Sequence, residues 1–161
     1  MVVDADALNI LACEPALLGT FLAPRILTPH PGEMARLLGV STAAVQGDRR
    51  GSAQALARQH GVWVVLKGSG TVVAAPDGML AINSTGNPGM AAGGMGDVLA
   101  GLIGSLLCQG LAPWPAACLG VYVHGLAGDL LAQELGVSFG FLASELAAAL
   151  PRACRLLREP A

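Results

Sequence analysis

The feature that most constrains the fold is a short, uninterrupted apolar run near the middle of the chain. Residues 62–66 read Val-Trp-Val-Val-Leu, with Gly61 before them and Lys67 after them. A strand without polar alternation is typical of a strand that is buried on both faces of a sheet. Such a strand needs helices on each side of the sheet. The run therefore predicts an α/β fold.

Further strand and helix patterns alternate around this run. Strands are predicted at residues 2–4, 25–28, 71–75 and 79–82, the last two joined by the hairpin turn signal Pro-Asp-Gly. Helices are predicted at residues 8–18 (interrupted near Pro15), 32–38, 97–108, 115–135 and from Ser144 onward, where Pro151 should break or kink the helix. Another helix is predicted to begin after Asp48 and to end at Gly61.

The composition fits one domain with a large buried core. The chain has 161 residues, of which 53% are hydrophobic and 12% are charged. The formal net charge of −2 gives no case for a nucleic-acid partner. The apolar run 98–107 is shorter than the roughly 20 residues that cross a bilayer, and residues 116–132 contain His124 and Asp129. Both segments are predicted to be buried helices, and no membrane association is expected.

The cysteines indicate a reducing compartment. Cys13, Cys108, Cys118 and Cys154 form no CxxC pair and lie at no metal-ligand spacing from a histidine. Three of them lie in apolar surroundings, where a free thiol behaves as a small hydrophobic group. A cytoplasmic location is therefore expected.

A glycine-rich segment connects a predicted strand to an apolar helix. Residues 84–96 contain five glycines, and Asp97 follows them. Glycines allow successive backbone N–H groups to turn toward one centre, and a helix N-terminus adds unpaired donors. The segment therefore predicts an anion site that suits phosphate oxygens.

Asp97 is placed to act on a group that enters this site. A carboxylate there does not bind phosphate directly, but it can accept a proton from a hydroxyl that attacks phosphorus. The alternative is that Asp97 only caps the helix and that the glycines form a tight connection. The segment has neither the GK[ST] of a Walker A loop nor a GxGxxG fingerprint.

The run GNPGMAAGGMGDVLAGLIG resembles the signature of the NAD(P)H-hydrate dehydratases, which belong to the ribokinase-like superfamily. Four more segments agree in order and spacing, and together they cover residues 2 to about 132: VVDADALN, ILTPHPGEMARLLG, VVLKGSGTVV and VYVHGLAGDLLA. The resemblance implies a three-layer α/β/α sandwich with a mainly parallel central sheet. Because the chain opens directly on a buried-type strand, residues 1–161 are expected to be the C-terminal portion of a larger domain, with its N-terminal part absent.

Two polar residues follow the predicted strand at 25–28. His30 and Glu33 lie three positions apart at a strand-to-helix turn, so both can face the crevice at the strand's C-terminal end. The alternative is a polar turn in which Glu33 balances the helix dipole. The resemblance implies that His30 contacts the hydrated nicotinamide substrate. Glu33 resembles the acid that orders Mg²⁺ and phosphate, through water or phosphate, in ribokinase-like kinases.

A lysine follows the central buried strand. Lys67 is well placed to meet a phosphate there, whereas the alternative is a solvated lysine in a hairpin turn. Asp4 and Asp6, after the first strand, either polarise Mg²⁺-bound water or cap the next helix, and His124 is expected to be a satisfied core histidine. The resemblance implies an adenine-nucleotide site made of Lys67, Gly68, Ser69, Gly70, Thr71, Gly93, Gly94, Met95 and Gly96.

The resemblance also implies an activity, the repair of hydrated NADH and NADPH. Asp97 would contact the substrate and deprotonate its ring hydroxyl as that oxygen attacks the terminal phosphoryl group of ADP or ATP, with Mg²⁺, and loss of phosphate would restore the reduced ring. Two alternatives remain: a ribokinase-like kinase of a vitamin precursor or another small alcohol, and a non-catalytic nucleotide-binding fragment. We further expect the chain to form a homo-oligomer or to associate with the missing part of the domain.

Overall fold

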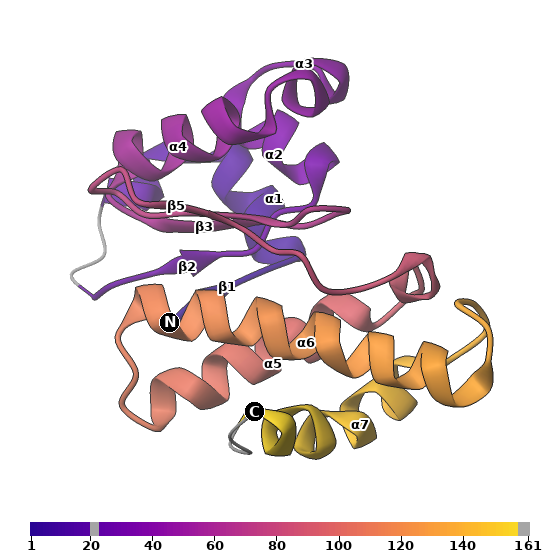
Figure 1. Ribbon diagram of the computed structural model, residues 1–161. Helices are drawn as coiled ribbons and strands as arrows, with labels where there is room; N and C mark the ends of the chain where they lie inside the picture. The colour runs from indigo at the N-terminus through magenta and orange to yellow at the C-terminus, as the bar shows by residue number, and fades with distance from the viewer. Residues whose placement is uncertain (20–22, 158–161) are drawn as a thin grey trace.

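The computed structural model describes residues 1–19 and 23–157, in which a five-stranded sheet lies between two groups of helices (Figure 1). One group packs on one face of the sheet and consists of α1 (Asp6–Cys13), α2 (Pro31–Leu38), α3 (Thr42–Gly47) and α4 (Arg49–His60). On the other face lie α5 (Met95–Cys108) and α6 (Pro113–Leu135), against which α7 (Ala143–Leu156) packs. The predicted α/β class and its layers are confirmed.

The sheet is mixed, and its strands follow their order in the sequence. These strands are β1 (Val2–Val3), β2 (Ile26–Leu27), β3 (Trp63–Leu66), β4 (Val72–Ala74) and β5 (Leu80–Ile82). The pairs β1–β2 and β2–β3 are parallel, and the pairs β3–β4 and β4–β5 are antiparallel. The predicted parallel character thus holds for the first three strands. Strands β4 and β5 each run opposite to the strand before them, because the connections at 67–71 and 75–79 are too short for a crossover.

Strand β3 is buried on both faces, as the sequence predicts. Val64 and Leu66 pack into the core beneath α1–α4, whereas Val65 packs against α5 and α6. All three side chains are fully buried. Because successive side chains of a strand point to opposite faces, this one strand contributes to both cores.

Local capping signals set the ends of α4. The Asp48 carboxylate accepts a 2.8 Å hydrogen bond from the Gly51 N–H, and Gly61 ends the helix with a left-handed φ of 62°. Both ends agree with the prediction. The short helix α3, which was not predicted from the sequence, is capped by the Ser41 hydroxyl, which accepts from the Ala44 N–H at 3.1 Å.

The starts of α1, α5 and α6 differ from their predicted positions, and the predicted break at Pro151 is wrong. Helix α1 begins at Asp6 rather than at Leu8, since an acidic residue in the first turn interacts favourably with the helix dipole. Helix α5 begins at Met95 rather than at Asp97, because Gly94 takes a left-handed φ of 84° and serves as the N-cap. Helix α6 begins at Pro113 rather than Pro115, since prolines in the first turn sacrifice no intrahelical hydrogen bond. Helix α7 continues through Pro151 to its end, because the residues on its buried face remain packed in the third core cluster.

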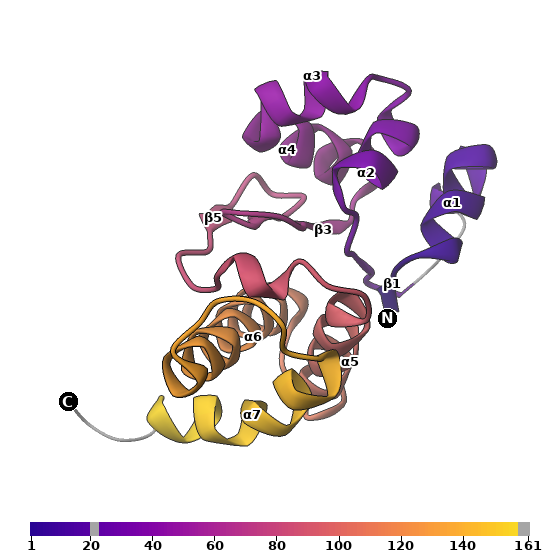
Figure 2. The ribbon, with the colours of Figure 1, turned by 90° about the vertical axis from the view of Figure 1, so that its right-hand side faces the viewer.

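Helix α6 has the length and apolar composition of a membrane span. It has 23 residues, and 56% of its most apolar window is buried inside the structure. It packs against α5, α7 and the sheet (Figure 2). This burial is typical of a core helix, as predicted for residues 116–132.

Helix α6 also closely approaches the segment that follows β5. A Cβ atom at Gly125 would lie 2.7 Å from the backbone carbonyl carbon of Thr85. A Cβ atom at Gly128 would lie 2.8 Å from Cγ of Met90. Glycine at these positions therefore allows the irregular segment to lie directly on the helix.

We predict that Gly125→Ala destabilises the chain by about 1–3 kcal/mol, since the added methyl group meets backbone that is unable to move without shifting the segment. Gly101→Ala is the matched control. Gly101 is also helical, and a Cβ atom added there would have no neighbour within 4 Å, so alanine should stabilise by about 0.5–1 kcal/mol. Urea denaturation of the two variants measures both effects. Equal stabilities would contradict the packing described.

Candidate functional site

Three parallel strands deliver polar residues to the same edge of the sheet. Asp4 follows β1, His30 lies beyond β2 and Lys67 follows β3. The Lys67 N–H donates to the Pro29 carbonyl at 2.8 Å, which continues the pairing of β2 and β3 past their ends. Because the C-terminal ends of parallel strands coincide, residues far apart in the sequence meet at this edge.

Lys67 lies between two carboxylates. Its ammonium donates to Asp4 Oδ1 at 2.7 Å and lies 4.0 Å from Glu33 Oε2. The Glu33 side chain is buried, and its Oε2 also accepts from the His30 backbone N–H at 2.7 Å. A Cβ atom at Gly96 would lie 3.2 Å from Lys67 Nζ. The ammonium is therefore held beside the first turn of α5.

His30 turns back on its own helix. Its Nδ1 accepts from the Gly32 and Glu33 N–H groups at 3.0 and 3.3 Å, which makes it the N-cap of α2 in a reciprocal capping box with Glu33. Its Nε2 lies 3.4 Å from Glu33 Oε1, and half of the side chain is exposed. This geometry assigns His30 a local role, and its predicted substrate contact stays a prediction.

The glycine-rich segment leads into the first turn of α5. It contains a short 3-10 helix, η2 (Pro88–Met90), and then reaches the N-cap Gly94, which has no side chain to satisfy the first N–H groups of the helix. These N–H groups and the positive end of the helix dipole favour an anion. The start of α5 therefore has the backbone donors that the sequence predicts for a phosphate site.

Asp97 is the third residue of α5, and its side chain is exposed. The alternative interpretation of Asp97 as the N-cap is wrong, because Gly94 occupies that position. A carboxylate in the first turn still interacts favourably with the helix dipole. Gly96 lies against the ion pair of Lys67 and Asp4. Asp97 is the next residue in the chain after this contact.

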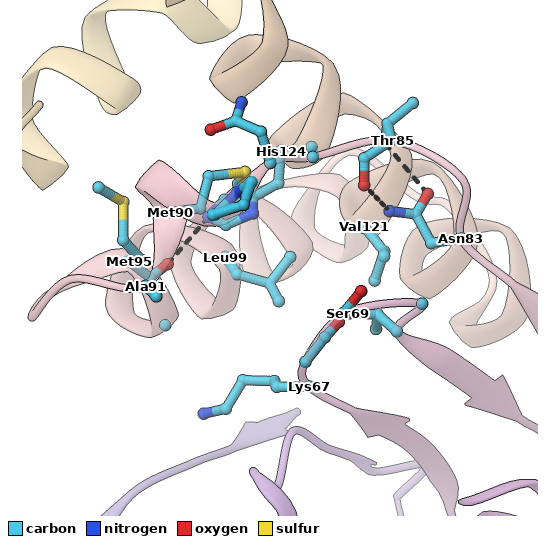
Figure 3. Close-up of a pocket in the computed structure, with 18 of the residues that line it drawn as sticks. Lys67, Ser69, Asn83, Thr85, Met90, Ala91, Met95, Leu99, Val121 and His124 are labelled. Carbon is cyan, nitrogen blue, oxygen red and sulfur yellow. Dashed lines mark hydrogen bonds between the residues drawn. The ribbon is translucent and has the colours of Figure 1, made fainter. Parts of the chain in front are cut away.

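A pocket of about 590 Å³ lies between the loop after β3 and the glycine-rich segment (Figure 3). This volume lies within the range of small-molecule sites. Lys67 and Ser69 line one side, and Thr85, Met90 and His124 line the other. Seven residues of the predicted nucleotide set line the pocket: Lys67, Gly68, Ser69, Gly70, Thr71, Met95 and Gly96. The other predicted site residues lie outside this lining: His30, Glu33, Gly93, Gly94 and Asp97.

His124 lines the pocket and fastens the start of α5. Its Nε2 lies 2.9 Å from the carbonyl oxygen of Met95, and the side chain is buried. Since a carbonyl only accepts, Nε2 carries the proton. Burial lowers the pKa of His124, and the hydrogen bond to Met95 opposes that shift in part. The prediction of a satisfied core histidine is correct, but the sequence pattern alone did not indicate its place in the pocket wall.

Arg49 fastens the opposite wall. Its Nη2 donates to the carbonyls of Leu66 and Lys67 at 3.0 and 3.2 Å, and burial lowers the pKa of its guanidinium. A Cβ atom at Gly68, whose φ is 134°, would lie 3.2 Å from the Arg49 guanidinium nitrogens. No sequence pattern indicated this role, because nothing local connects the start of α4 to the end of β3.

The carboxylates near Lys67 fit a magnesium ion that phosphate helps to hold. Among the residues described, no group of three or more His, Cys, Asp or Glu side chains converges on one point. Mg²⁺ keeps several waters and takes one or two carboxylates together with substrate phosphates. Asp4 and Glu33 supply that number of carboxylates beside the start of α5.

The sequence of the chain matches a known protein family and several of its members. The family model described as NAD(P)H-hydrate dehydratase matches residues 1–152. A bifunctional NAD(P)H-hydrate repair enzyme of Moorella thermoacetica is 51% identical over 98% of this chain and 30% of its own length. An ADP-dependent (S)-NAD(P)H-hydrate dehydratase of Neisseria meningitidis is 48% identical over 92% of this chain and 51% of its own. The chain thus spans between about a third and a half of the length of these relatives.

Solved structures agree with the sequence matches. The ADP/ATP-dependent NAD(P)H-hydrate dehydratase of Bacillus subtilis, co-crystallised with ATP and Mg²⁺, superposes with a TM-score of 0.82 at 37% identity, over 96% of this chain and 54% of that one. A ribokinase-like superfamily protein of Enterococcus faecalis superposes with a TM-score of 0.80 at 30% identity, over 99% of this chain and 53% of that one. The predicted ribokinase-like fold is therefore confirmed.

We predict that His124 makes folding stability depend on pH below about 6.5, the ordinary histidine pKa. Because burial lowers the pKa of His124 in the folded state, the unfolded chain binds the proton more readily as the pH falls. Stability is therefore lost from about pH 6.5 down through the lowered pKa, with a slope of at most about 1.4 kcal/mol per pH unit.

His124→Gln should remove this slope while keeping a donor for Met95. The comparison is best made in a His60→Gln background, because burial also lowers the pKa of His60. Denaturation midpoints measured from pH 7.5 to 5 provide the test. An unchanged slope in His124→Gln would show that His124 is not the group responsible.

Proposed function

The chain belongs to the NAD(P)H-hydrate dehydratase family, as its motifs predict, and on that premise we propose that it carries the nucleotide-binding part of an enzyme that dehydrates hydrated NADH and NADPH. The co-substrate is ADP or ATP, the nucleotides named for the relatives from Neisseria meningitidis and Bacillus subtilis. The observation that carries the proposal is the pocket between the loop after β3 and the glycine-rich segment. It combines an ammonium, glycine-rich backbone and a helix N-terminus, which suit a phosphate chain.

The nucleotide lies along this pocket in our proposal. Its phosphates approach Lys67 and the start of α5, where backbone N–H groups stabilise the charge on the transferred phosphoryl group. The residues proposed to bind it are Lys67, Gly68, Ser69, Gly70, Thr71, Gly93, Gly94, Met95 and Gly96. Asp4 and Glu33 would hold Mg²⁺ through water or phosphate, and the ion would neutralise phosphate charge there. His30 is proposed to contact the hydrated nicotinamide.

Asp97 is proposed to act as the general base. Its carboxylate takes the proton of the ring hydroxyl while that oxygen attacks the terminal phosphorus and the bond to the departing AMP or ADP breaks. The ring carbon then loses phosphate with the bonding electrons, a neighbouring carbon loses a proton, and the ring double bond returns. Phosphate is a much better leaving group than hydroxide. A fold that phosphorylates hydroxyl groups therefore suits a dehydration.

The wider setting of the proposal is a reducing compartment such as the cytoplasm. Four free cysteines support that assignment. Cys13, Cys108 and Cys154 are exposed, so the predicted apolar surroundings of three cysteines are wrong, and of these four described residues only Cys118 packs against a core cluster. We also propose that residues 1–161 form part of one larger dehydratase domain, because the chain spans about half of the single-function dehydratase that it matches.

The direct test is phosphate release from hydrated NADH in the presence of ADP or ATP, with the full protein. We expect stoichiometric phosphate and NADH, the latter followed by its absorbance. A stable phosphorylated product without phosphate release would instead identify a kinase. Nucleotide binding without turnover of any hydrated cofactor would identify a non-catalytic nucleotide-binding module.

Asp97→Asn should lower kcat by about 10²–10⁴-fold, the usual contribution of a general base. Nucleotide affinity and folding should persist, because the N-cap of α5 is Gly94 and the substitution removes no capping hydrogen bond. Calorimetry with ADP and the phosphate assay measure the two effects separately. Turnover close to that of the wild type would exclude Asp97 as the base.

A further inference from the structure

One wall of the pocket is made of irregular chain. Residues 83–88 and 90–92 all line the pocket, and the only regular structure there is the single turn of η2. An irregular wall presents its ligand-facing atoms correctly only if other contacts hold it in place. The question is therefore which side chains hold this segment before a nucleotide arrives.

Helix α6 provides the supporting surface. The Thr85 hydroxyl donates to the Tyr122 carbonyl at 2.9 Å, and Gly125 and Gly128 allow close packing of the segment. These contacts fix the middle of the segment against the helix. None of these contacts is a hydrogen bond to the turn at Gly86 and Asn87. Another side chain of α6 holds that turn.

That group is Asp129. Its Oδ2 accepts from the Gly86 N–H at 2.8 Å, and its Oδ1 accepts from the Asn87 side-chain Nδ2 at 3.1 Å. Asn87 Oδ1 in turn accepts from the Gly89 N–H at 3.1 Å. One carboxylate on α6 thus controls three hydrogen bonds of the pocket wall, two directly and one through Asn87.

The polarity of this chain of bonds is fixed. A carboxylate only accepts, so the Asn87 amide must direct its NH₂ group toward Asp129 and its oxygen toward Gly89. Hydrogen bonds to an ionised acceptor are roughly twice as strong as neutral ones. Gly86, with a φ of 101°, takes the left-handed turn that brings its N–H to the carboxylate.

We propose that Asp129 is a positioning residue for the nucleotide pocket and that it acts through Asn87. This inference rests on the function proposed above. By holding the turn at residues 86–89 before the ligand binds, Asp129 spares the nucleotide the entropy loss of ordering it. We expect the effect on binding, because Asp129 lies outside the pocket lining and its hydrogen bonds go to Gly86 and Asn87, not to the proposed base on α5.

The test is a polarity swap between the two side chains. In Asp129→Asn, a single amide oxygen replaces two carboxylate oxygens, so the new NH₂ group faces either the Asn87 NH₂ group or the Gly86 N–H. One hydrogen bond is lost in either orientation, and relief of the first by rotation of Asn87 breaks its bond to Gly89. We expect ADP affinity to fall about tenfold, the loss that one hydrogen bond to a charged group produces. In Asn87→Asp, two carboxylates face each other, and the loss should be at least as large.

The double variant Asp129→Asn/Asn87→Asp should restore binding to within about threefold of the wild type, because all three hydrogen bonds form again with the central one reversed. The readouts are the ADP dissociation constant by calorimetry, and KM against kcat in the full protein. KM should follow the affinity, and kcat should change little. The double variant also keeps the test decisive if a single variant folds poorly.

Glu134→Gln is the matched control. It is also an acid-to-amide change on α6, but Glu134 pairs with Arg152 on the surface, and the change should leave ADP affinity unchanged. Unchanged affinity in Asp129→Asn, or a double variant no better than the single ones, would overturn the inference. Failure of the wild type to bind ADP would instead refute the proposed nucleotide site itself.

Discussion

The structure depends on the burial of β3 between two cores. Val64 and Leu66 join β3 to the helices on one face, and Val65 joins it to α5 and α6 on the other. No other strand of the described chain contributes three fully buried large side chains in succession. The strand also fixes the position of Lys67, because its last residue leads directly into the pocket. The core and the candidate site therefore share one element.

The pocket walls are irregular, and each is held by a polar side chain from a helix. Arg49 holds the carbonyls at the end of β3, His124 holds the carbonyl at the start of α5, and Asp129 holds the turn at Gly86. In each case a backbone group finds its partner on an element that is distant in the sequence. The bonds of His124 and Arg49 are buried or partly buried, and that of Asp129 to Gly86 is exposed. Glycines with left-handed φ values or close neighbours then leave the space for a ligand.

Local signals in the sequence were sufficient for much of this architecture. The apolar run of β3, the hairpin turn between β4 and β5 and the caps of α4 each depend on residues a few positions apart. The boundaries that failed depend on tertiary context. Packing keeps α7 helical through Pro151, and the conformation of Gly94 starts α5 before the carboxylate that was expected to mark it.

The residues of the candidate site also fall into two groups, those predicted from local signals and those whose roles depend on tertiary contacts. Lys67 and Gly96 were predicted from their places at the end of a strand and the start of a helix, and both line the pocket. The partner of Lys67 is Asp4, which lies 63 positions away, and the sequence indicates for Asp4 only a helix cap or a residue near magnesium-bound water. The roles of Arg49, His124 and Asp129 rest on contacts between elements that are distant in the sequence. No spacing in the sequence encodes those contacts.

In the proposed function, one adenine nucleotide contacts both the loop after β3 and the glycine-rich segment. Hydrogen–deuterium exchange followed by mass spectrometry, with and without ADP, tests it most directly. We expect slower exchange in residues 67–71 and in residues 84–96 when ADP is bound, with little change in α7. Protection confined to only one of these segments, or found elsewhere in the chain, would contradict a shared site.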